Sequence, residues 1–339
     1  MAAQPIQPLH ETEGNFNPLQ VVVHNTTESS EAAPTAKPFI EAGTVEATLE
    51  EIKKRHIIPV FHRDNEPVIS QVEFIQTTMQ AVKETFPSER ILSPSIRLSH
   101  AVKGRVPEAK DKPAKELLEW EKTIYYERMA FLIEVASIQD TIDGQPLSLT
   151  VGGVKAHNLD NLYSKRGTDQ HFKIFIGFKV SVCTNLCVWS DGYAGDVKVK
   201  SLEQLQTSIQ ELLRSYDAIS SLKQMGALQQ YSLTEQQFAQ LIGRCRLYQH
   251  LPTAKRKDIP PLEFHDTQVN QVAKDFYRDN SFCRDSEGNI NLWRLYNLFT
   301  QANKSSYIDA FLDRGVNASA LVSSLASMLE HKQEHWFIS

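Results

Sequence analysis

The residues best suited to chemistry in this sequence form a basic stretch between Ile96 and Arg128, IRLSHAVKGRVPEAKDKPAKELLEWEKTIYYER. Cationic side chains on an exposed strand and loop can bind phosphate groups, and aromatic rings beside them offer a surface on which unpaired bases stack. We therefore predict a nucleic-acid-binding site in this stretch. The predicted site residues are Arg97, His100, Lys103, Arg105, Lys110, Lys112, Lys115, Tyr125 and Tyr126.

The same stretch has a second interpretation as a solvated connector, because loops are normally polar. Acidic residues offset its cations, namely Glu108, Asp111, Glu116, Glu119 and Glu121. Two prolines, Pro107 and Pro113, would stiffen such a loop and limit the entropy lost on binding. The sequence alone leaves both interpretations open. A second basic cluster, Arg244 to Lys257, either extends the same face or belongs to an unrelated linker.

Metal binding is not predicted from the cysteines. Cys183 and Cys187 stand four apart in a predicted strand, where residues i and i+4 face the same way but lie roughly 13 Å apart. Zinc sites need close pairs with a second pair or histidines at defined spacing. We interpret these two, Cys245 and Cys283 as reduced structural thiols, too few for a disulfide scaffold.

Catalytic motifs are also missing from the sequence. The segment TVGGVKAHN lacks the spacing of a phosphate-binding loop, and neither a Gly-x-Ser-x-Gly nor a His-Glu-x-x-His pattern occurs. We interpret His157, His171 and His265 as surface or core histidines. No catalytic residue, metal or cofactor is predicted, although an unrecognised nuclease or hydrolase stays open because a missing motif is weak evidence.

Composition places the chain among ordinary globular proteins. It has 339 residues, 41% of them hydrophobic, and a formal net charge of −5, which argues against a protein whose whole surface binds nucleic acid. The first residues lack the pattern of a secretory signal, and no segment approaches the ~18 apolar residues of a membrane helix. We expect a soluble, cytoplasmic protein that does not enter a membrane.

Hydrophobic periodicity predicts an α+β fold. Apolar residues recur at steps of three and four after Ser70, which indicates a capped helix. Strands are predicted near 128–138, 147–156 and 172–180, the first two joined through a DGQP turn. We expect a central antiparallel sheet with flanking helices, followed by a mostly helical C-terminal part. The predicted divisions are a disordered, flexible arm over 1–50, a sheet module over 56–200 and a helical module over 201–339.

Helix signals in the C-terminal part include apolar residues at helical spacing from Leu202 to Leu222, a Ser232 to Glu235 capping box, and N-caps at Asn291 and Asn317. The chain ends on HWFIS, whose aromatic residues either dock on the core or anchor a partner chain. We favour docking within the chain.

Three segments taken together resemble an uncharacterised protein family of gut bacteria, a domain of unknown function. They are SHAVKGRVPEAKDKPAKELLEWEKTIYYERMAF, LTVGGVKAHNLDNL and FKIFIGFKVSVCTNLCVWSDG. More remotely, VCTNLCVWSDG followed at a distance by NLWRLYNLFTQANK is similar to the phage/plasmid-like protein family of mobile elements. This resemblance implies a mobile-DNA context and transfers no catalytic residue.

Two functions follow as hypotheses. The first is a non-enzymatic accessory protein of a mobile genetic element that binds nucleic acid, with single-stranded DNA preferred because no basic helix-turn-helix pattern is present. The alternative is a protein-interaction factor, for host-defence modulation or complex assembly, that binds a protein partner through the C-terminal helices.

Overall fold

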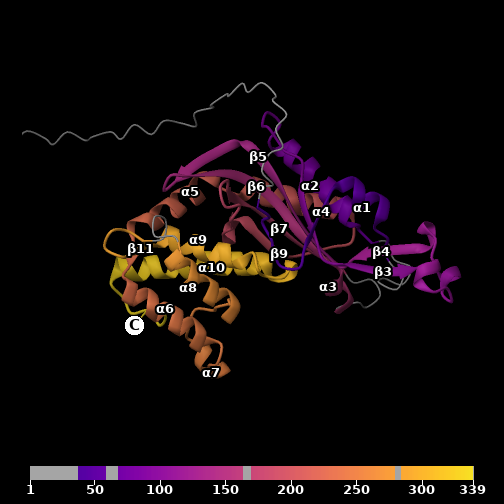
Figure 1. Ribbon diagram of the computed structural model, residues 1–339. Helices are drawn as coiled ribbons and strands as arrows, with labels where there is room; N and C mark the ends of the chain where they lie inside the picture. The colour runs from indigo at the N-terminus through magenta and orange to yellow at the C-terminus, as the bar shows by residue number, and fades with distance from the viewer. Residues whose placement is uncertain (1–36, 59–67, 163–168, 279–283, 339) are drawn as a thin grey trace, which may run out of the picture. The chain divides into compact units, whose positions relative to one another are not determined.

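The computed structural model describes residues 37–58, 68–162, 169–278 and 284–338. Its centre is an antiparallel sheet in the order β1-β2-β5-β6-β7-β8, with β9 also paired to β7 (Figure 1). The strands are β1 (Val45–Ala47), β2 (Ser95–Leu98), β5 (Arg128–Ile142), β6 (Gln145–Ala156), β7 (Gln170–Val180), β8 (Leu186–Cys187) and β9 (Tyr193–Val199). The predicted α+β class and antiparallel sheet are confirmed.

The longest hairpin of the sheet joins β5 to β6 through Asp143 and Gly144. Both residues have positive φ, 51° and 73°, as a two-residue turn matched to strand twist requires. The predicted turn is therefore confirmed. Asp143 also accepts a 2.7 Å hydrogen bond from Arg294, which ties the turn to the C-terminal helices.

Alternating side chains of the central strands pack on opposite faces of the sheet. Phe131 of β5 and Phe172 of β7 contact Phe74 of α2 (Gln71–Thr85), with ring centroids 5.0 and 4.8 Å from it. Phe175, of opposite parity to Phe172, belongs to a second cluster with Phe311 of α10 (Ile308–His331). Helices therefore cover both faces of the sheet.

The two glycines of TVGGVKAHN have a packing role within β6. A Cβ on Gly153 would lie 2.5 Å from the Phe74 ring, and one on Gly152 would lie 2.1 Å from the Phe131 carbonyl. Side chains at these positions would collide with α2 and with β5. The glycines thus allow close approach of the sheet to its neighbours.

Both N-terminal helices begin at a capping residue, and the cap predicted at Ser70 is confirmed. Ser70 caps α2, and Thr48 caps α1 (Leu49–Arg55), each with a complete capping box. Before them, Phe39 and Ile40 are buried against the sheet and α10. The predicted arm otherwise falls on residues 1–36, outside the described part, so its extent stays a prediction.

The C-terminal part is mostly helical, as predicted. After α3 (His157–Leu162) between β6 and β7, the remaining elements are α4 (Leu202–Ser215), α5 (Ala218–Ala227), β10 (Ser232–Leu233), α6 (Glu235–Tyr248), α7 (Thr253–Arg256), α8 (Asp266–Arg278), β11 (Ile290–Asn291), α9 (Leu292–Asn303) and α10. One hydrophobic cluster includes both β7 and α9 side chains. The division into modules near residue 200 stays a prediction.

Two helix-cap predictions are wrong. The helical spacing over 202–222 is confirmed, and this stretch forms two helices because Asp217 is the N-cap of α5. Ser232 lies in β10, and Thr234 caps α6 instead. Asn317 lies inside α10, where its buried side chain donates to the Pro261 carbonyl and accepts from a backbone amide. Its side-chain amide bonds the loop at 261–263, and the sequence pattern of a helix cap does not distinguish such an asparagine from a capping one.

The aromatic residues of the C-terminal tail pack on the helices. Phe337 and Ile338 are buried, and the Phe337 ring lies 5.9 Å from that of Tyr248 in α6. Trp336 packs edge-on against Phe337. Docking of the tail within the chain is therefore confirmed, and these rings are not exposed anchors for a partner.

Candidate functional site

The basic stretch forms a two-stranded hairpin, β3 (Ala101–Arg105) and β4 (Lys122–Tyr126), that is not part of the main sheet (Figure 1). Short 3-10 turns join the strands over 107–109, 114–116 and 119–121. Arg105 lies opposite Lys122 and Lys103 opposite Ile124. Because cross-strand partners and alternate residues share a face, Lys103, Arg105 and Lys122 lie on one face of the hairpin.

Arg97 lies in β2 of the main sheet, which precedes the hairpin in the sequence. Its guanidinium donates 3.0 Å hydrogen bonds to the hydroxyl and carbonyl of Thr44, and it forms a 3.9 Å ion pair with Glu46. Only 12% of its side chain is exposed. In this structure Arg97 fixes the N-terminal segment onto the sheet.

Two predicted phosphate ligands hold the hairpin loop together. The Arg105 guanidinium donates to the carbonyls of Ala109 and Lys112. The Lys112 ammonium pairs with Glu121, a buried carboxylate that also accepts from the Leu118 amide. These contacts give the loop a defined conformation, and they engage both cations within it.

The remaining lysines of the predicted site are exposed. Lys103, Lys110 and Lys115 form no ion pair within the described structure. His100 precedes β3 and lines a cavity at the base of the hairpin. The structure therefore separates the predicted cations into internally bonded ones and solvent-facing ones.

The aromatic residues of the stretch differ in exposure. Tyr125 is buried with its ring stacked on His56 at 5.8 Å, and burial together with the Glu127 charge raises the pKa of its hydroxyl. Tyr126 is half-buried, and its carbonyl accepts from Gln71. Trp120, by contrast, is 67% exposed. Sequence reasoning missed Trp120, although its neighbours Glu119, Glu121 and Lys122 are the kind of charged flank that indicates a solvent-facing ring.

The second basic cluster contains cations that stack on aromatic rings. Arg244 lies over the Trp336 ring at 4.9 Å, and Arg256 over Tyr248 at 5.4 Å. Arg256 also donates to the carbonyls of Leu251 and Gln249. These contacts give both arginines a role in packing the C-terminal helices.

The cysteine interpretation needs one correction. Cys187 is buried in β8, but Cys183 lies in the turn between β7 and β8, not in a strand. Burial raises the pKa of the Cys183 thiol, which makes it a poor nucleophile. Within the described ranges no cluster of three or more His, Cys, Asp or Glu side chains could hold a metal ion. Cys283 lies outside those ranges.

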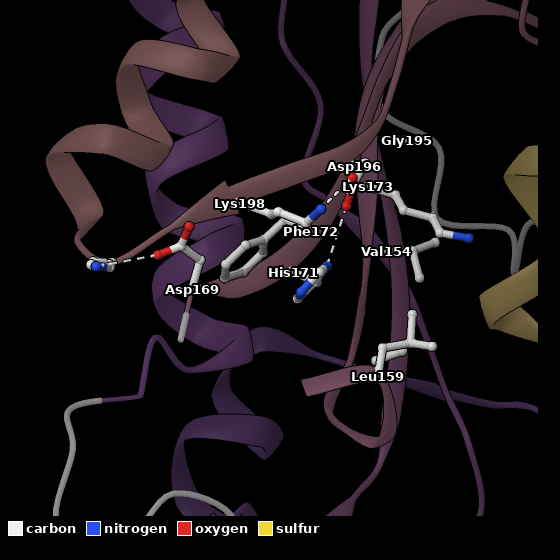
Figure 2. A pocket seen from close by; sticks show the side chains of 11 residues that line it. Val154, Leu159, Asp169, His171, Phe172, Lys173, Gly195, Asp196 and Lys198 are labelled. Atoms are coloured by element: carbon white, nitrogen blue, oxygen red, sulfur yellow. Dashed lines mark hydrogen bonds and ion pairs between the residues drawn. The ribbon is translucent and has the colours of Figure 1, made fainter. Parts of the chain in front are cut away.

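A second candidate site is a cavity of about 680 Å³ over the outer part of β7 and β9. Figure 2 shows His171 in it, with its Nδ1 3.3 Å from the Asp196 carboxylate. Lys198 pairs with the same carboxylate at 2.6 Å, and Lys200 lies 3.7 Å from Asp169. A histidine–carboxylate pair can serve as a general base, but the described residues that line this cavity include no hydroxyl or thiol nucleophile.

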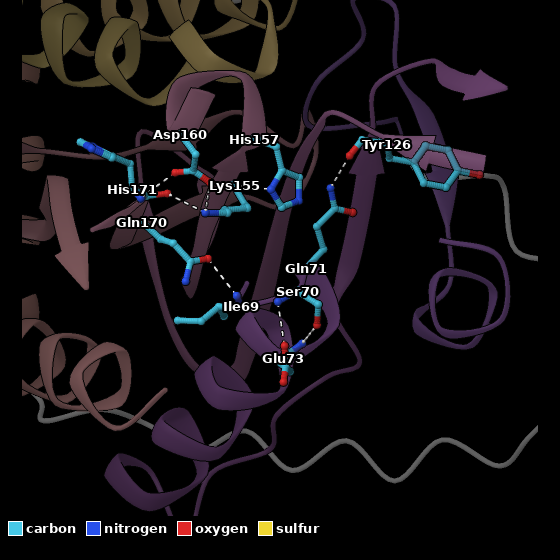
Figure 3. Close-up of polar contacts among 10 residues, drawn as sticks. All are labelled: Ile69, Ser70, Gln71, Glu73, Tyr126, Lys155, His157, Asp160, Gln170 and His171. Atoms are coloured by element: carbon cyan, nitrogen blue, oxygen red, sulfur yellow. Dashed lines mark hydrogen bonds and ion pairs between the residues drawn. The ribbon is translucent and has the colours of Figure 1, made fainter. Parts of the chain in front are cut away.

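Beneath this cavity lies a buried ion pair. The Lys155 ammonium of β6 lies 2.6 Å from Asp160 of α3, and the other oxygen of Asp160 accepts from the His171 amide at 2.9 Å (Figure 3). Burial disfavours the charged carboxylate, but the His157 side chain, Lys155 and that amide outweigh it and lower the pKa of Asp160 to about 2. The pair is fully enclosed and joins three elements, which indicates a structural role.

The fold and these sites define an α+β protein with a separate charged hairpin and, among its described residues, no cluster of side chains that could hold a metal ion. The chain matches a family described as "Domain of unknown function, B. Theta Gene description (DUF3871)" over residues 20–338, and it belongs to that family. No curated protein and no solved structure matches it significantly. None of the described helices has the length and apolar character needed to cross a membrane.

Proposed function

We propose that this protein binds single-stranded nucleic acid through the β3–β4 hairpin. The observation that supports the proposal is an exposed tryptophan, Trp120, on a hairpin that carries three exposed lysines without ion pairs, Lys103, Lys110 and Lys115. Lysines attract the phosphate backbone, and an indole ring can stack on an unpaired base. The stacking ring is therefore Trp120 and not the buried Tyr125.

The preference for single strands follows from accessibility. A base in a duplex is already stacked on its neighbours, whereas an unpaired base has a free face for an aromatic side chain. The hairpin has only a small surplus of positive charge, because its glutamates and aspartate offset most of its cations. We therefore expect modest, sequence-tolerant affinity that depends on salt.

An accessory, non-enzymatic role on a mobile element is the finer part of the proposal. It is supported by the resemblance of VCTNLCVWSDG and NLWRLYNLFTQANK to the phage/plasmid-like pattern. Cys187, Trp293 and Tyr296 of these segments are buried, so these three side chains pack in the core.

The experiment is fluorescence anisotropy with labelled single-stranded and duplex DNA. The triple variant Lys103→Glu, Lys110→Glu and Lys115→Glu should abolish binding at low salt. A matched control changes the same charge at exposed lysines outside the hairpin, Lys83, Lys223 and Lys274, and should bind nearly as well as the parent. Equal losses in both triple variants would show a diffuse effect of net charge, and no loss in the first would remove the hairpin as the site.

The alternative, a protein-interaction factor acting through the C-terminal helices, stays a proposal, but fewer aromatic side chains are accessible to a partner than the sequence suggests. The large rings Trp293, Tyr296 and Phe337 are buried and cannot contact a partner. A partner surface there would have to use exposed side chains such as Leu247 and Tyr277. Changing both to Ser should abolish capture of a partner without altering DNA binding, if this alternative is correct.

A further inference from the structure

A cavity of about 720 Å³ lies at the base of the hairpin and differs in chemistry from the cavity around His171. It is lined by segments distant in sequence: 42–44, residues 99–102 at the start of β3, the 127–128 junction between β4 and β5, the start of α8, the turn from α9 to α10, and Arg314 within α10. Its size falls in the range of pockets that hold a small organic molecule.

The polar lining of this cavity consists mainly of hydrogen-bond donors. It contains two guanidinium groups, from Arg128 and Arg314, and two imidazoles, from His100 and His265, but a single carboxylate, Glu127. Hydroxyl groups come from Thr44, Ser99, Thr267, Ser305 and Tyr307. A lining of this kind favours an anionic ligand, because cations and donors outnumber the acidic side chains.

The two arginines are held in place yet keep donor capacity. Arg314 donates from Nε to the Glu263 carbonyl at 2.9 Å and from Nη1 to the Ser306 hydroxyl at 2.8 Å, which fixes the plane of its guanidinium. Arg128 Nη1 lies 3.3 Å from Glu127, and its buried Nε lies 3.5 Å from the Asp309 carboxylate, a contact that does not meet hydrogen-bond geometry. A buried donor whose hydrogen bond is poorly formed costs free energy, and a ligand oxygen that replaces Asp309 could form a better one.

The rim of the cavity is apolar and aromatic. Tyr307 is 71% exposed, and Val102 on β3 is 55% exposed. Exposed side chains of this kind can contact the uncharged body of a ligand, while the donors inside hold its anionic group.

We propose that this cavity binds a phosphate monoester, with the phosphate between Arg128 and Arg314 and the organic body against Val102 and Tyr307. The dianionic, tetrahedral phosphate can accept from the remaining donors of two guanidinium groups and from the surrounding hydroxyls at once, which a single carboxylate does less well. Asp309 is the counterion that this phosphate must displace from Arg128. The proposal does not depend on nucleic-acid binding by the hairpin.

The test is isothermal titration calorimetry of the full chain with inorganic phosphate, adenosine 5′-monophosphate and glucose 6-phosphate, and with uncharged adenosine as the negative control. We expect the monoesters to bind and adenosine not to bind. Arg314→Gln and Arg128→Gln should each weaken the Kd by about tenfold or more, since a charge-assisted hydrogen bond is lost. Asp309→Asn should tighten it, because the competing carboxylate is gone.

The matched control is Arg278→Gln, which removes an ion-paired arginine from the far end of α8 and should leave the Kd unchanged. Circular dichroism checks that each variant is folded, and Arg314→Lys keeps the charge if the glutamine variant unfolds. No heat with any of the three phosphates overturns the proposal, as does binding that the Asp309→Asn change fails to tighten.

Two sources of the phosphate can be separated in the same way. An oligonucleotide with a 5′-phosphate should compete with adenosine 5′-monophosphate more strongly than the same strand with a 5′-hydroxyl, if the natural ligand is a strand end. Equal competition by both strands assigns the cavity to a free phosphorylated molecule. The hairpin variant with Lys103, Lys110 and Lys115 changed to Glu should still bind the monophosphate, which separates failure of one proposal from failure of the other.

Discussion

The buried pair Lys155–Asp160 and the hairpin pair Lys122–Glu119 have the same chemistry in opposite surroundings. The first has side chains 0% and 6% exposed, and the second 44% and 91%. Both pairs are close, at 2.6 and 2.5 Å. Geometry alone therefore does not separate them, and access of water does.

The consequence is a division of labour between the two regions. Charges in the interior must be paired, since an isolated buried charge costs several kcal/mol, so Lys155 and Asp160 can do little besides hold β6, α3 and β7 together. Exposed charges on the hairpin contribute little to stability and can exchange partners. Charges that can exchange partners are the ones able to meet a phosphate backbone.

The largest expected effect comes from breaking the buried pair. Lys155→Met should lower the free energy of unfolding by about 3–5 kcal/mol, because it leaves the Asp160 carboxylate buried without its cation. Urea denaturation measures the change. The double variant with Asp160→Asn as well should recover part of the loss, whereas additive losses would show that the two side chains do not act as a pair.

Two aromatic residues give the next comparison. Phe337 is buried in the C-terminal tail, and Phe337→Ala should cost about 3 kcal/mol by leaving a cavity beside Tyr248. Trp120 is exposed, and Trp120→Ala should change stability by less than about 0.5 kcal/mol. Thermal denaturation of both variants tests this difference in stability. A large loss on changing Trp120 would show that its ring packs on the protein and is not available to a base.

Acid should remove the contribution of the interior pair only at low pH. The folded-state pKa of Asp160 is about 2, below its ordinary value, so its contribution to stability is present above about pH 4 and is lost as the pH falls toward 2. The full contribution is about 2 kcal/mol. Stability measured between pH 5 and pH 2 should fall more steeply in the parent than in Asp160→Asn. Parallel curves would contradict the assignment.

The smallest effect is expected for the exposed pair. Lys122→Gln should change the free energy of unfolding by less than about 1 kcal/mol, since solvent and salt already screen its contact with Glu119. Chemical denaturation at low and high salt measures it. A loss comparable to that of Lys155→Met would show that the hairpin charges are structural and would weaken the binding proposal.

Local patterns in the sequence predict much of the fold. Alternating side chains of β7, the Asp143–Gly144 turn and the caps at Thr48, Ser70 and Asn291 are set by neighbours a few residues away. Asn317 shows the limit, because its partners lie more than fifty residues earlier in the chain. A capping residue and a buried amide that bonds a loop look alike in the sequence.

The candidate sites are less predictable for the same reason. Tyr125 and Trp120 are close in sequence, but His56 covers the first and leaves the second exposed. Which lysines are free depends on pairs such as Lys112–Glu121 across the hairpin loop. The cavity with Arg128 and Arg314 exists only once six separate segments meet, and neither composition nor residue spacing predicts it.

The most direct measurement is the salt dependence of single-stranded DNA binding by the parent and by a variant with Lys103, Lys110 and Lys115 changed to Gln. For single strands the slope of log K against log salt is about −0.7 for each phosphate contact. If the three lysines meet phosphates, the variant's slope should be shallower by about 2. Identical slopes, with or without weaker binding, would contradict the assignment of the hairpin as the nucleic-acid site.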